Sequence, residues 1–276
     1  MRPPVLIPRE ETEDWTVRLA ETLRPSTTSP VTLLDLCTGS GCIPLLLCHL
    51  WPPGSVVATG VDINPAAVQL AKENAFLCGT ASPLENPPEE HAPVSQTKRP
   101  DRPDRIDTGE QGVEGTDTAK LDYRIRSPPR SPSNTFDAVV ADLMQDEFIT
   151  AARLRPPYDV VTANPPYIPM AEYAGLPASV REHEDVRALV GNLSDTSGVG
   201  LEMPEEDRAK GLAFYHRIAI LVGSHGLLRR GGTLALEVGE GQASAVAAIV
   251  EHKARLGRID VWKDPWGKER VVVARK

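Results

Sequence analysis

The apolar residues of this 276-residue chain fall into short runs that alternate with longer stretches of helical spacing. Runs rich in Val, Ile and Leu predict buried strands, because a central parallel strand is covered on both faces. Helical spacing between them predicts an α/β fold with a doubly wound, mostly parallel, seven-stranded Rossmann-like sheet. The last two runs flank the turn sequence Asp264-Pro-Trp-Gly-Lys268, which predicts an antiparallel pair and one reversed strand. The expected strands are residues 31–36, 56–62, 136–141, 159–164, 233–238, 259–262 and 270–274.

Apolar residues at helical spacing predict helices at residues 12–23, 43–50, 65–75, 212–228 and 242–254. Thr12 is the expected N-cap of the first helix, because threonine side chains accept a hydrogen bond from the first turn. Asn64 followed by Pro65 is the expected start of the third. The helix at 212–228 is expected to be stopped by Gly231-Gly232.

A long connection rich in Glu, Gly and Pro spans residues 169–206, with one helical patch at 186–190. A connection of that length at a ligand-binding edge is typical of a substrate lid. Within it, His183 and Glu184 are expected at the surface. Arg9 and Glu13, taken alone, are expected to be the solvated start of the first helix.

Residues 79–135 differ sharply in composition from the rest, with many prolines among Glu, Asp, Arg, Ser and Gly. Such a segment buries too little apolar surface to offset the entropy of ordering, so it is expected to be a disordered insertion. Its basic residues are mostly balanced by acids, which favours a solvated tether over a binding tail. The expected organisation is an extended segment and helix at 1–30 and a domain at 31–276, interrupted by this insertion.

Charge and cysteine usage exclude several classes of partner. A net charge of −8 and a pI near 5.4 argue against a surface that neutralises phosphates, so no direct contact with nucleic acid is expected. No apolar run reaches the roughly 18 residues of a membrane span. The four cysteines lack the paired spacing of a zinc site and are expected to be buried free thiols in a reducing compartment, without metal. Targeting leaders contain few acidic residues, whereas this chain has acidic residues from Glu10 onwards. The protein is therefore expected to be cytosolic or to have its targeting segment outside this chain.

The strand at 159–164 ends in Asn164-Pro165-Pro166-Tyr167, and two prolines cannot continue a hydrogen-bonded ladder. The chain must therefore leave the sheet at Asn164, at the carboxyl end of a strand, where open α/β sheets bind ligands. The tetrapeptide offers a side-chain carbonyl, free backbone carbonyls and an aromatic face. These groups suit a planar NH2 donor.

The strand at 31–36 runs into a glycine-containing loop and then a helix, which is the arrangement of a nucleotide-type site. Gly39 and Gly41 let the backbone approach a ligand. Pro44 occupies the position of the third glycine in the Gly-x-Gly-x-x-Gly motif of dinucleotide-binding proteins. The sequence therefore argues against a cofactor that contains a pyrophosphate. Asp62 ends the next strand about 20 residues on, where an acidic side chain accepts hydrogen bonds from ribose hydroxyls.

With both motifs placed, the chain resembles class I S-adenosylmethionine-dependent methyltransferases, and within them the HemK/PrmC family of protein-(glutamine-N5) methyltransferases. That family methylates the side-chain nitrogen of the glutamine in the Gly-Gly-Gln loop of peptide-chain release factors. The Asn-Pro-Pro-Tyr motif fixes only the reaction class, and the Leu-Ile-Pro-Arg segment narrows it. The matching segments are Val5-Leu-Ile-Pro-Arg9 with Thr12-Glu13, Asp35-Leu-Cys-Thr-Gly-Ser-Gly41, Val61-Asp62, Asn164-Pro-Pro-Tyr167, Ala188-Leu189, Gly232, Leu236-Glu-Val-Gly239, Gln242 and Glu269-Arg270.

The resemblance implies a methyltransferase that uses S-adenosylmethionine, with a release factor as its partner. It assigns the loop at 37–41 to the methionine side of the cofactor, Asp62 to the ribose and Asp142-Leu143 to the adenine. The implied cofactor-binding residues are Cys37, Thr38, Gly39, Ser40, Gly41, Asp62, Asp142, Leu143 and Asn164. The implied catalytic residues are Asn164, Pro165 and Tyr167, and the implied substrate-binding residues are Asn164, Pro165, Pro166, Tyr167 and Arg9.

This sequence departs from the family pattern in three places. Cys37 stands where many members have glycine, a change that is tolerable with a negative φ. Residues 79–135 replace what is usually a short turn. We also expect the family's amino-terminal helical domain, which helps to grip the release factor, to be missing.

Two other functions fit parts of the pattern. Asn-Pro-Pro-Tyr also marks adenine-amino methyltransferases, but an adenine-N6 enzyme acting on nucleic acid should have a basic face or a base-reading domain, and the sequence indicates neither. The other is a catalytically silent cofactor-binding subunit, whose acceptor-side segments are held by a partner. By resemblance, the insertion and the variant loop favour a mitochondrial location, with the cytoplasm as the alternative.

Overall fold

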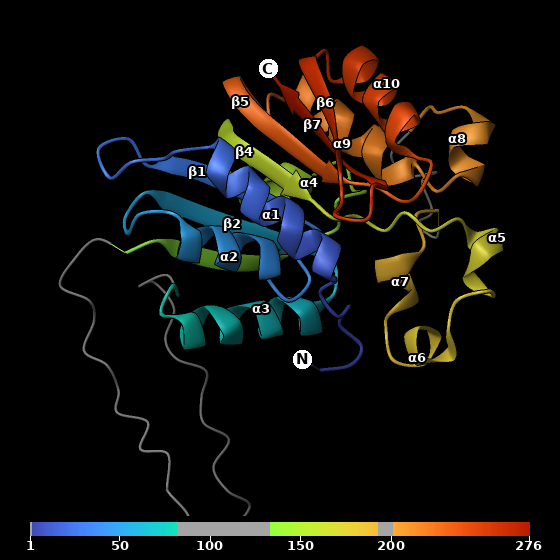
Figure 1. Cartoon of the computed structure of the whole chain (residues 1–276), viewed down its shortest axis with the longest axis horizontal. Helices are drawn as coiled ribbons and strands as arrows, with labels where there is room; N and C mark the ends of the chain where they lie inside the picture. Colours follow the sequence, from blue (N-terminus) through green and yellow to red (C-terminus); the bar gives the residue numbers. More distant parts are fainter. Residues whose placement is uncertain (1, 82–132, 193–200) are drawn as a thin grey trace, which may run out of the picture. The chain divides into compact units, whose positions relative to one another are not determined.

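One sheet of seven strands organises the described part of the chain, which is residues 2–81, 133–192 and 201–276 of a computed structural model. Its order is β3-β2-β1-β4-β5-β7-β6 (Figure 1). Neighbours among β1 to β5 pair in parallel, and β7 runs antiparallel to both β5 and β6. The predicted doubly wound sheet with one reversed strand is confirmed. The strands are β1 (Val31–Leu36), β2 (Val56–Asp62), β3 (Thr135–Val140), β4 (Tyr158–Ala163), β5 (Leu228–Glu237), β6 (Gly257–Lys263) and β7 (Glu269–Arg275).

Helices cover both faces of the sheet (Figure 1). Helices α1, α2 and α3 share an apolar cluster with Leu33, and α4, α9 and α10 share the opposite cluster with Leu34. These neighbours fall in different clusters because successive side chains of a strand point to opposite faces. None of the helices in the described ranges is long and apolar enough to cross a membrane. The helices named here are α1 (Glu10–Thr22), α2 (Cys42–Leu50), α3 (Pro65–Cys78), α4 (Phe148–Ala151), α9 (Ala213–Gly223) and α10 (Ala243–Lys253).

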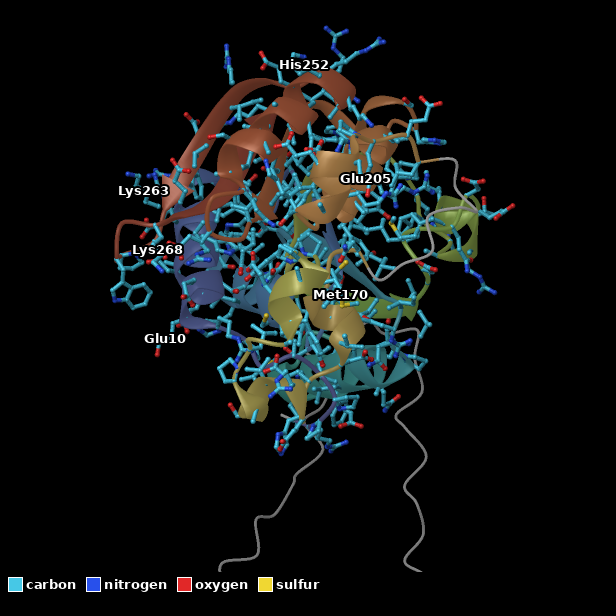
Figure 2. The ribbon with its side chains drawn as sticks, turned by 90° about the vertical axis from the view of Figure 1, so that its right-hand side faces the viewer. Glu10, Met170, Glu205, His252, Lys263 and Lys268 are labelled. Atoms are coloured by element: carbon cyan, nitrogen blue, oxygen red, sulfur yellow. The ribbon has the colours of Figure 1, made fainter. Side chains whose placement is uncertain are left out.

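The long connection after β4 carries three short helices, α5 (Met170–Tyr173), α6 (Ala178–Arg181) and α7 (Val186–Leu189), before α8 (Glu205–Ala209). Helix α7 coincides with the helical patch predicted at 186–190. Figure 2 looks onto this side of the molecule, with Met170 and Glu205 labelled. The amino-terminal segment lies against the connection, because the Asp185 amide donates to the Pro4 carbonyl at 2.8 Å. Residues 193–200 lie outside the described ranges, and the expected role as a lid stays a prediction.

The glycine pair at 231–232 does not stop a helix, so that prediction was wrong. Helix α9 already ends at Gly223, and β5 begins at Leu228 and runs through both glycines. Gly231 has φ +77° beside a shift of the β4–β5 register, and a Cβ on Gly232 would lie 2.8 Å from the Asp159 carbonyl. The glycines therefore mark an irregular strand in close contact with its neighbour, a role that glycine commonly has in sheets.

The start of α1 also differs from expectation. Arg9 is the N-cap residue, without a side-chain capping bond, and Thr12 lies inside the helix. The Thr12 side chain is buried and donates to the Glu237 carboxylate at 2.7 Å. The predicted cap at Thr12 was wrong because this distant acceptor binds its hydroxyl. The predicted cap at Asn64 is confirmed, since its side-chain oxygen accepts from the Ala66 amide at 2.9 Å.

Most of the expected insertion, residues 82–132, lies outside the described residues. The predicted bounds of the insertion, residues 79 and 135, are too wide, because residues at both ends form hydrogen bonds with the folded domain. The Thr80 carbonyl accepts from the Phe136 amide at 2.8 Å, and the Asn134 side chain is buried and accepts from the Ser55 amide at 2.8 Å. Local composition does not reveal either of these long-range bonds.

All four cysteines are free and belong to the described residues. Cys48 is buried, Cys37 and Cys42 are half-buried, and Cys78 is exposed. The expectation of buried thiols is therefore wrong for Cys78, which lies in the last turn of α3.

Candidate active site

A cavity of about 600 Å³ opens at the carboxyl ends of β1, β2 and β4. Cofactor sites in α/β sheets lie at this edge, and their volumes commonly range from about 300 to 1,000 Å³. Part of the wall is the amino-terminal segment, and part is the connection after β4. The predicted site residues that line it are Cys37, Gly39, Asp62, Asp142, Leu143, Asn164 and Pro166. The predicted residues Arg9, Thr38, Ser40, Gly41, Pro165 and Tyr167 are not among its lining residues.

The loop after β1 has two glycines with positive φ, and they have different physical reasons. A Cβ on Gly41 would lie 2.8 Å from the Phe136 ring, so close packing at the start of α2 requires glycine there. A Cβ on Gly39 would meet no described atom within 4 Å, and Gly39 lines the cavity. Of the two, Gly39 is therefore the residue at which a ligand can approach the backbone.

Cys37 has φ +58°, so the negative φ that would make it an easy replacement for glycine is contradicted. A left-handed backbone costs a residue with a Cβ roughly 1–2 kcal/mol. Burial, and then the charges of Asp62, Asp35 and Asp142, raise the pKa of the Cys37 thiol well above its ordinary value. The side chain therefore faces the cavity as an uncharged thiol.

Asp62 ties the two strand ends together beneath the cavity. Its carboxylate oxygens accept from the Gly39 amide and the Asn64 amide, each at 2.8 Å. Burial raises the pKa of Asp62, and the two backbone amides partly oppose that rise. Each carboxylate oxygen keeps a further lone pair, so the group can still accept hydrogen bonds from a ligand's hydroxyls.

Asp35 supports the loop from below. It is fully buried, and its two carboxylate oxygens accept from the Thr38 and Thr162 hydroxyls at 2.6 Å each. Burial raises the pKa of Asp35 to about 7, against the lowering effect of the two hydroxyls. Thr38 therefore acts here as a support for the loop.

Asn164 follows β4 directly and lines the cavity. Its amino group donates to the Thr12 hydroxyl oxygen at 3.3 Å. Among the described residues, no backbone amide donates to the Pro165 carbonyl and no hydrogen bond reaches the side-chain oxygen of Asn164. The side-chain oxygen of Asn164 therefore remains available in the cavity wall for an incoming NH2 group.

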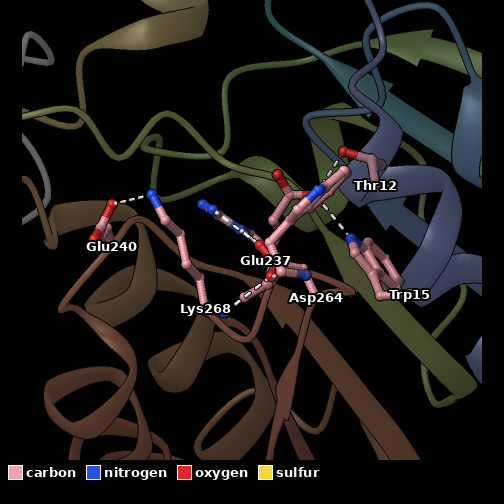
Figure 3. A network of polar contacts seen from close by, with 8 residues as sticks. Thr12, Trp15, Glu237, Glu240, Asp264 and Lys268 are labelled. Carbon is pink, nitrogen blue, oxygen red and sulfur yellow. Dashed lines mark hydrogen bonds and ion pairs between the residues drawn. The ribbon is translucent and has the colours of Figure 1, made fainter.

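Behind Asn164 lies a buried polar group that sequence reasoning did not assign to the site. The Glu237 carboxylate accepts from the Thr12 hydroxyl and from the Trp15 indole, both at 2.7 Å (Figure 3). Burial raises the pKa of Glu237, and these two donors oppose the rise. The Thr12-Glu13 and Leu236-Glu237 segments both match the family pattern in the sequence. Neither segment by itself indicates that Thr12 and Glu237 contact each other.

Tyr167 is held by the start of α10 rather than by the cavity wall. Its carbonyl accepts from the Gln242 side chain at 2.8 Å, and a Cβ on Gly239 would lie 3.0 Å from its ring. Burial raises the pKa of Tyr167 to about 12, so the phenol is uncharged. The residue can therefore contribute a packing surface.

Arg9 and Glu184 form an ion pair in which one guanidinium nitrogen contacts both carboxylate oxygens, at 2.6 and 2.8 Å. The Glu184 side chain is only 2% exposed, so its expected surface position was wrong, and the charge of Arg9 explains its burial. His183 is exposed, as expected. The guanidinium of Arg9 is thus engaged within the chain, and its assignment to substrate binding stays a prediction.

Comparison with known proteins adds a second line of information. No family model matches the chain. It is 31% identical over 273 residues to a release factor glutamine methyltransferase of Moorella thermoacetica, which covers 99% of this chain and 68% of that protein. A release factor glutamine methyltransferase of Cereibacter sphaeroides is also 31% identical, over 98% of this chain and 66% of that protein. A solved methyltransferase structure from Pyrococcus furiosus aligns over all of this chain and 87% of its own, with TM-score 0.52 and 11% identity, which concerns the fold alone.

Proposed function

This chain belongs to the release factor glutamine methyltransferase family, and from that premise we propose the reaction that it catalyses. It transfers a methyl group from S-adenosylmethionine to the side-chain amide nitrogen of the glutamine in the Gly-Gly-Gln loop of a peptide-chain release factor. Residues 31–276 form the catalytic domain. The observation that supports this most strongly is the position of Asn164 in the wall of the same cavity as Gly39 and Asp62.

The lining residues fit the proposed cofactor chemically. Asp62 has carboxylate lone pairs for ribose hydroxyls, and Gly39 leaves its backbone open to a close ligand. Apolar side chains such as Leu143 offer a surface for an adenine ring beside the Asp142 carboxylate. When bound, S-adenosylmethionine supplies a methyl group attached to a positively charged sulfur. Cys37, as an uncharged thiol, adds no charge next to that group.

The chemical problem is that an amide nitrogen is a poor nucleophile, because its lone pair is shared with the carbonyl. The Asn164 side-chain oxygen and the Pro165 carbonyl counter this by accepting one hydrogen bond each from the NH2 group of the glutamine. The nitrogen–methyl bond forms as the sulfur–methyl bond breaks, and the methylated nitrogen then releases one proton to water. Two fixed acceptors hold the nitrogen in one orientation and favour the positive charge that develops on it. Tyr167 packs against the amide plane as a neutral ring.

A labelling experiment tests this reaction. The protein is mixed with methyl-labelled S-adenosylmethionine and a release factor whose loop glutamine is intact or changed to alanine. We expect label on the intact factor alone. Equal label on both factors contradicts the proposal, as does label on adenine in added nucleic acid, which indicates the adenine-N6 reaction. Cofactor binding without transfer indicates the silent subunit.

Two finer assignments also belong to this proposal. The expected partner is a release factor, and we keep a mitochondrial location as a prediction, although the two relatives compared above are bacterial. Locating a fluorescently tagged full-length protein in cells tests the second assignment, and a purely cytoplasmic signal contradicts it.

A further inference from the structure

Three side chains from two distant parts of the chain form a buried line of hydrogen bonds that ends at Asn164. The Asn164 amino group donates to Thr12. Thr12 and Trp15 both donate to the same carboxylate oxygen of Glu237 (Figure 3). Thr12 and Glu237 are 225 residues apart in sequence, on α1 and β5. Their exposed fractions are 3% and 1%, so solvent does not compete for the bond between them, whereas the bond from Asn164 is part-buried.

With the Glu237 side chain as a carboxylate, the donors and acceptors in this line have fixed directions. An indole nitrogen can only donate, so the Glu237 oxygen that faces Trp15 must accept. The Thr12 hydroxyl has one hydrogen and gives it to the same oxygen, which leaves Thr12 only lone pairs for Asn164. An Asn164 side chain turned over by 180° would set its oxygen against those lone pairs. The amino group must therefore face Thr12, and the oxygen is left for the cavity.

A buried glutamate at position 237 lowers the stability of the fold if its only role is packing. It lies on the face of the sheet covered by α1, whose neighbouring cluster is apolar, and burial works against its charge. An apolar side chain of similar volume often packs as well as, or better than, a buried charge. A carboxylate here provides what an apolar side chain cannot, which is a fixed acceptor at the end of the line.

We propose that Thr12 and Glu237 are positioning residues, which fix the orientation of the Asn164 amide so that its oxygen faces the acceptor nitrogen. This inference rests on the proposed function, because it concerns the same reaction. It assigns a catalytic consequence to a threonine that is not among the residues lining the cavity.

The test compares three single variants. Thr12→Val removes the hydroxyl at nearly constant volume, and Thr12→Ser keeps it. Thr16→Val is the matched control, because Thr16 is a fully buried threonine one turn along the same helix whose hydroxyl donates only to the Thr12 carbonyl, at 2.6 Å. If valine is not accommodated at residue 12, Thr12→Ala gives the same comparison without adding a methyl group.

The expected result is a selective loss of kcat. Thr12→Val should lower kcat for release factor methylation by about tenfold, the rate equivalent of one buried hydrogen bond, whereas Thr12→Ser should stay within about threefold of wild type. The KM for the release factor and the dissociation constant of S-adenosylmethionine should change little in either variant. Equal losses in Thr12→Val and Thr16→Val would overturn the proposal, because they indicate a general disturbance of α1.

A second readout needs no acceptor protein. The side-chain NH2 signal of Asn164, identified by its loss in Asn164→Asp, should exchange with solvent more slowly in wild type and Thr12→Ser than in Thr12→Val. Unchanged exchange in Thr12→Val overturns the positioning role. If wild type does not methylate the release factor but the exchange difference is present, the proposed function fails while the fixed orientation of Asn164 stands.

Discussion

Replacing Asp35 with asparagine should change how the stability of this protein depends on pH. Asp35 is fully buried beneath the cavity loop, and burial raises the pKa of its carboxyl from 3.8 to about 7. At a pH between 3.8 and about 7, Asp35 keeps its proton in the folded state but has released it in the unfolded state. The free energy of unfolding contributed by this group is therefore fully present below pH 4 and is lost as pH rises to about 7.

The size of the effect follows from the same two pKa values. Each tenfold change in proton affinity corresponds to about 1.4 kcal/mol, so a rise from 3.8 to about 7 corresponds to roughly 4 kcal/mol. Asparagine does not titrate. It can accept from one threonine hydroxyl and donate to the other, so its own effect on stability should be a constant offset.

The assay is urea unfolding of wild type and Asp35→Asn at several pH values from 4.5 to 8, a window taken from the cited pKa of Asp35. Groups that do not interact with Asp35 titrate equally in both proteins, so the informative quantity is the difference between the two free energies of unfolding. Relative to wild type, the variant should gain roughly 3–4 kcal/mol across this window and then level off above pH 7. A difference that is independent of pH would refute this reasoning.

Two further substitutions test the site and its wall. Asp62→Asn should raise the dissociation constant of S-adenosylmethionine by about tenfold or more, because it removes a charged acceptor for the ribose; an unchanged constant in calorimetry counts against that contact. Arg9→Ala should lower the free energy of unfolding by about 3 kcal/mol, because it leaves the carboxylate of Glu184 buried without its partner. The double variant Arg9→Ala with Glu184→Gln should recover part of this loss, and no recovery would indicate that the ion pair is not the cause.

The sheet could be predicted from the sequence because its signals are local. Apolar runs such as residues 31–36 and 56–62 match β1 and β2 residue for residue, and alternation with helices then restricts the strand order to a few possibilities. The prediction failed at Gly231-Gly232, because a pair of glycines is typical both of the end of a helix and of an irregular strand. Only the approach of the Asp159 carbonyl to Gly232 separates them, and that is a contact between two strands.

The candidate site was partly predictable for the same reason. Asn164 and Asp62 each end a predicted strand, and parallel strand ends meet at one edge, so their common cavity follows from the topology. The roles of Thr12 and Glu184 could not be predicted. Each looks like an ordinary surface or capping residue until its partner, Glu237 or Arg9, is brought to it by the fold. The positive φ of Cys37 is likewise set by the turn at the end of β1, whereas the residue type favours the opposite sign.

The most direct test of the central claim is the single-turnover rate of methyl transfer to the loop glutamine by wild type and by Asn164→Ala. The product peptide is sequenced by mass spectrometry to locate the methyl group. We expect wild type to methylate the glutamine side chain and the variant to be slower by roughly 10²-fold or more, with a much smaller change in cofactor affinity. A variant that transfers the methyl group at nearly the wild-type rate would contradict the account.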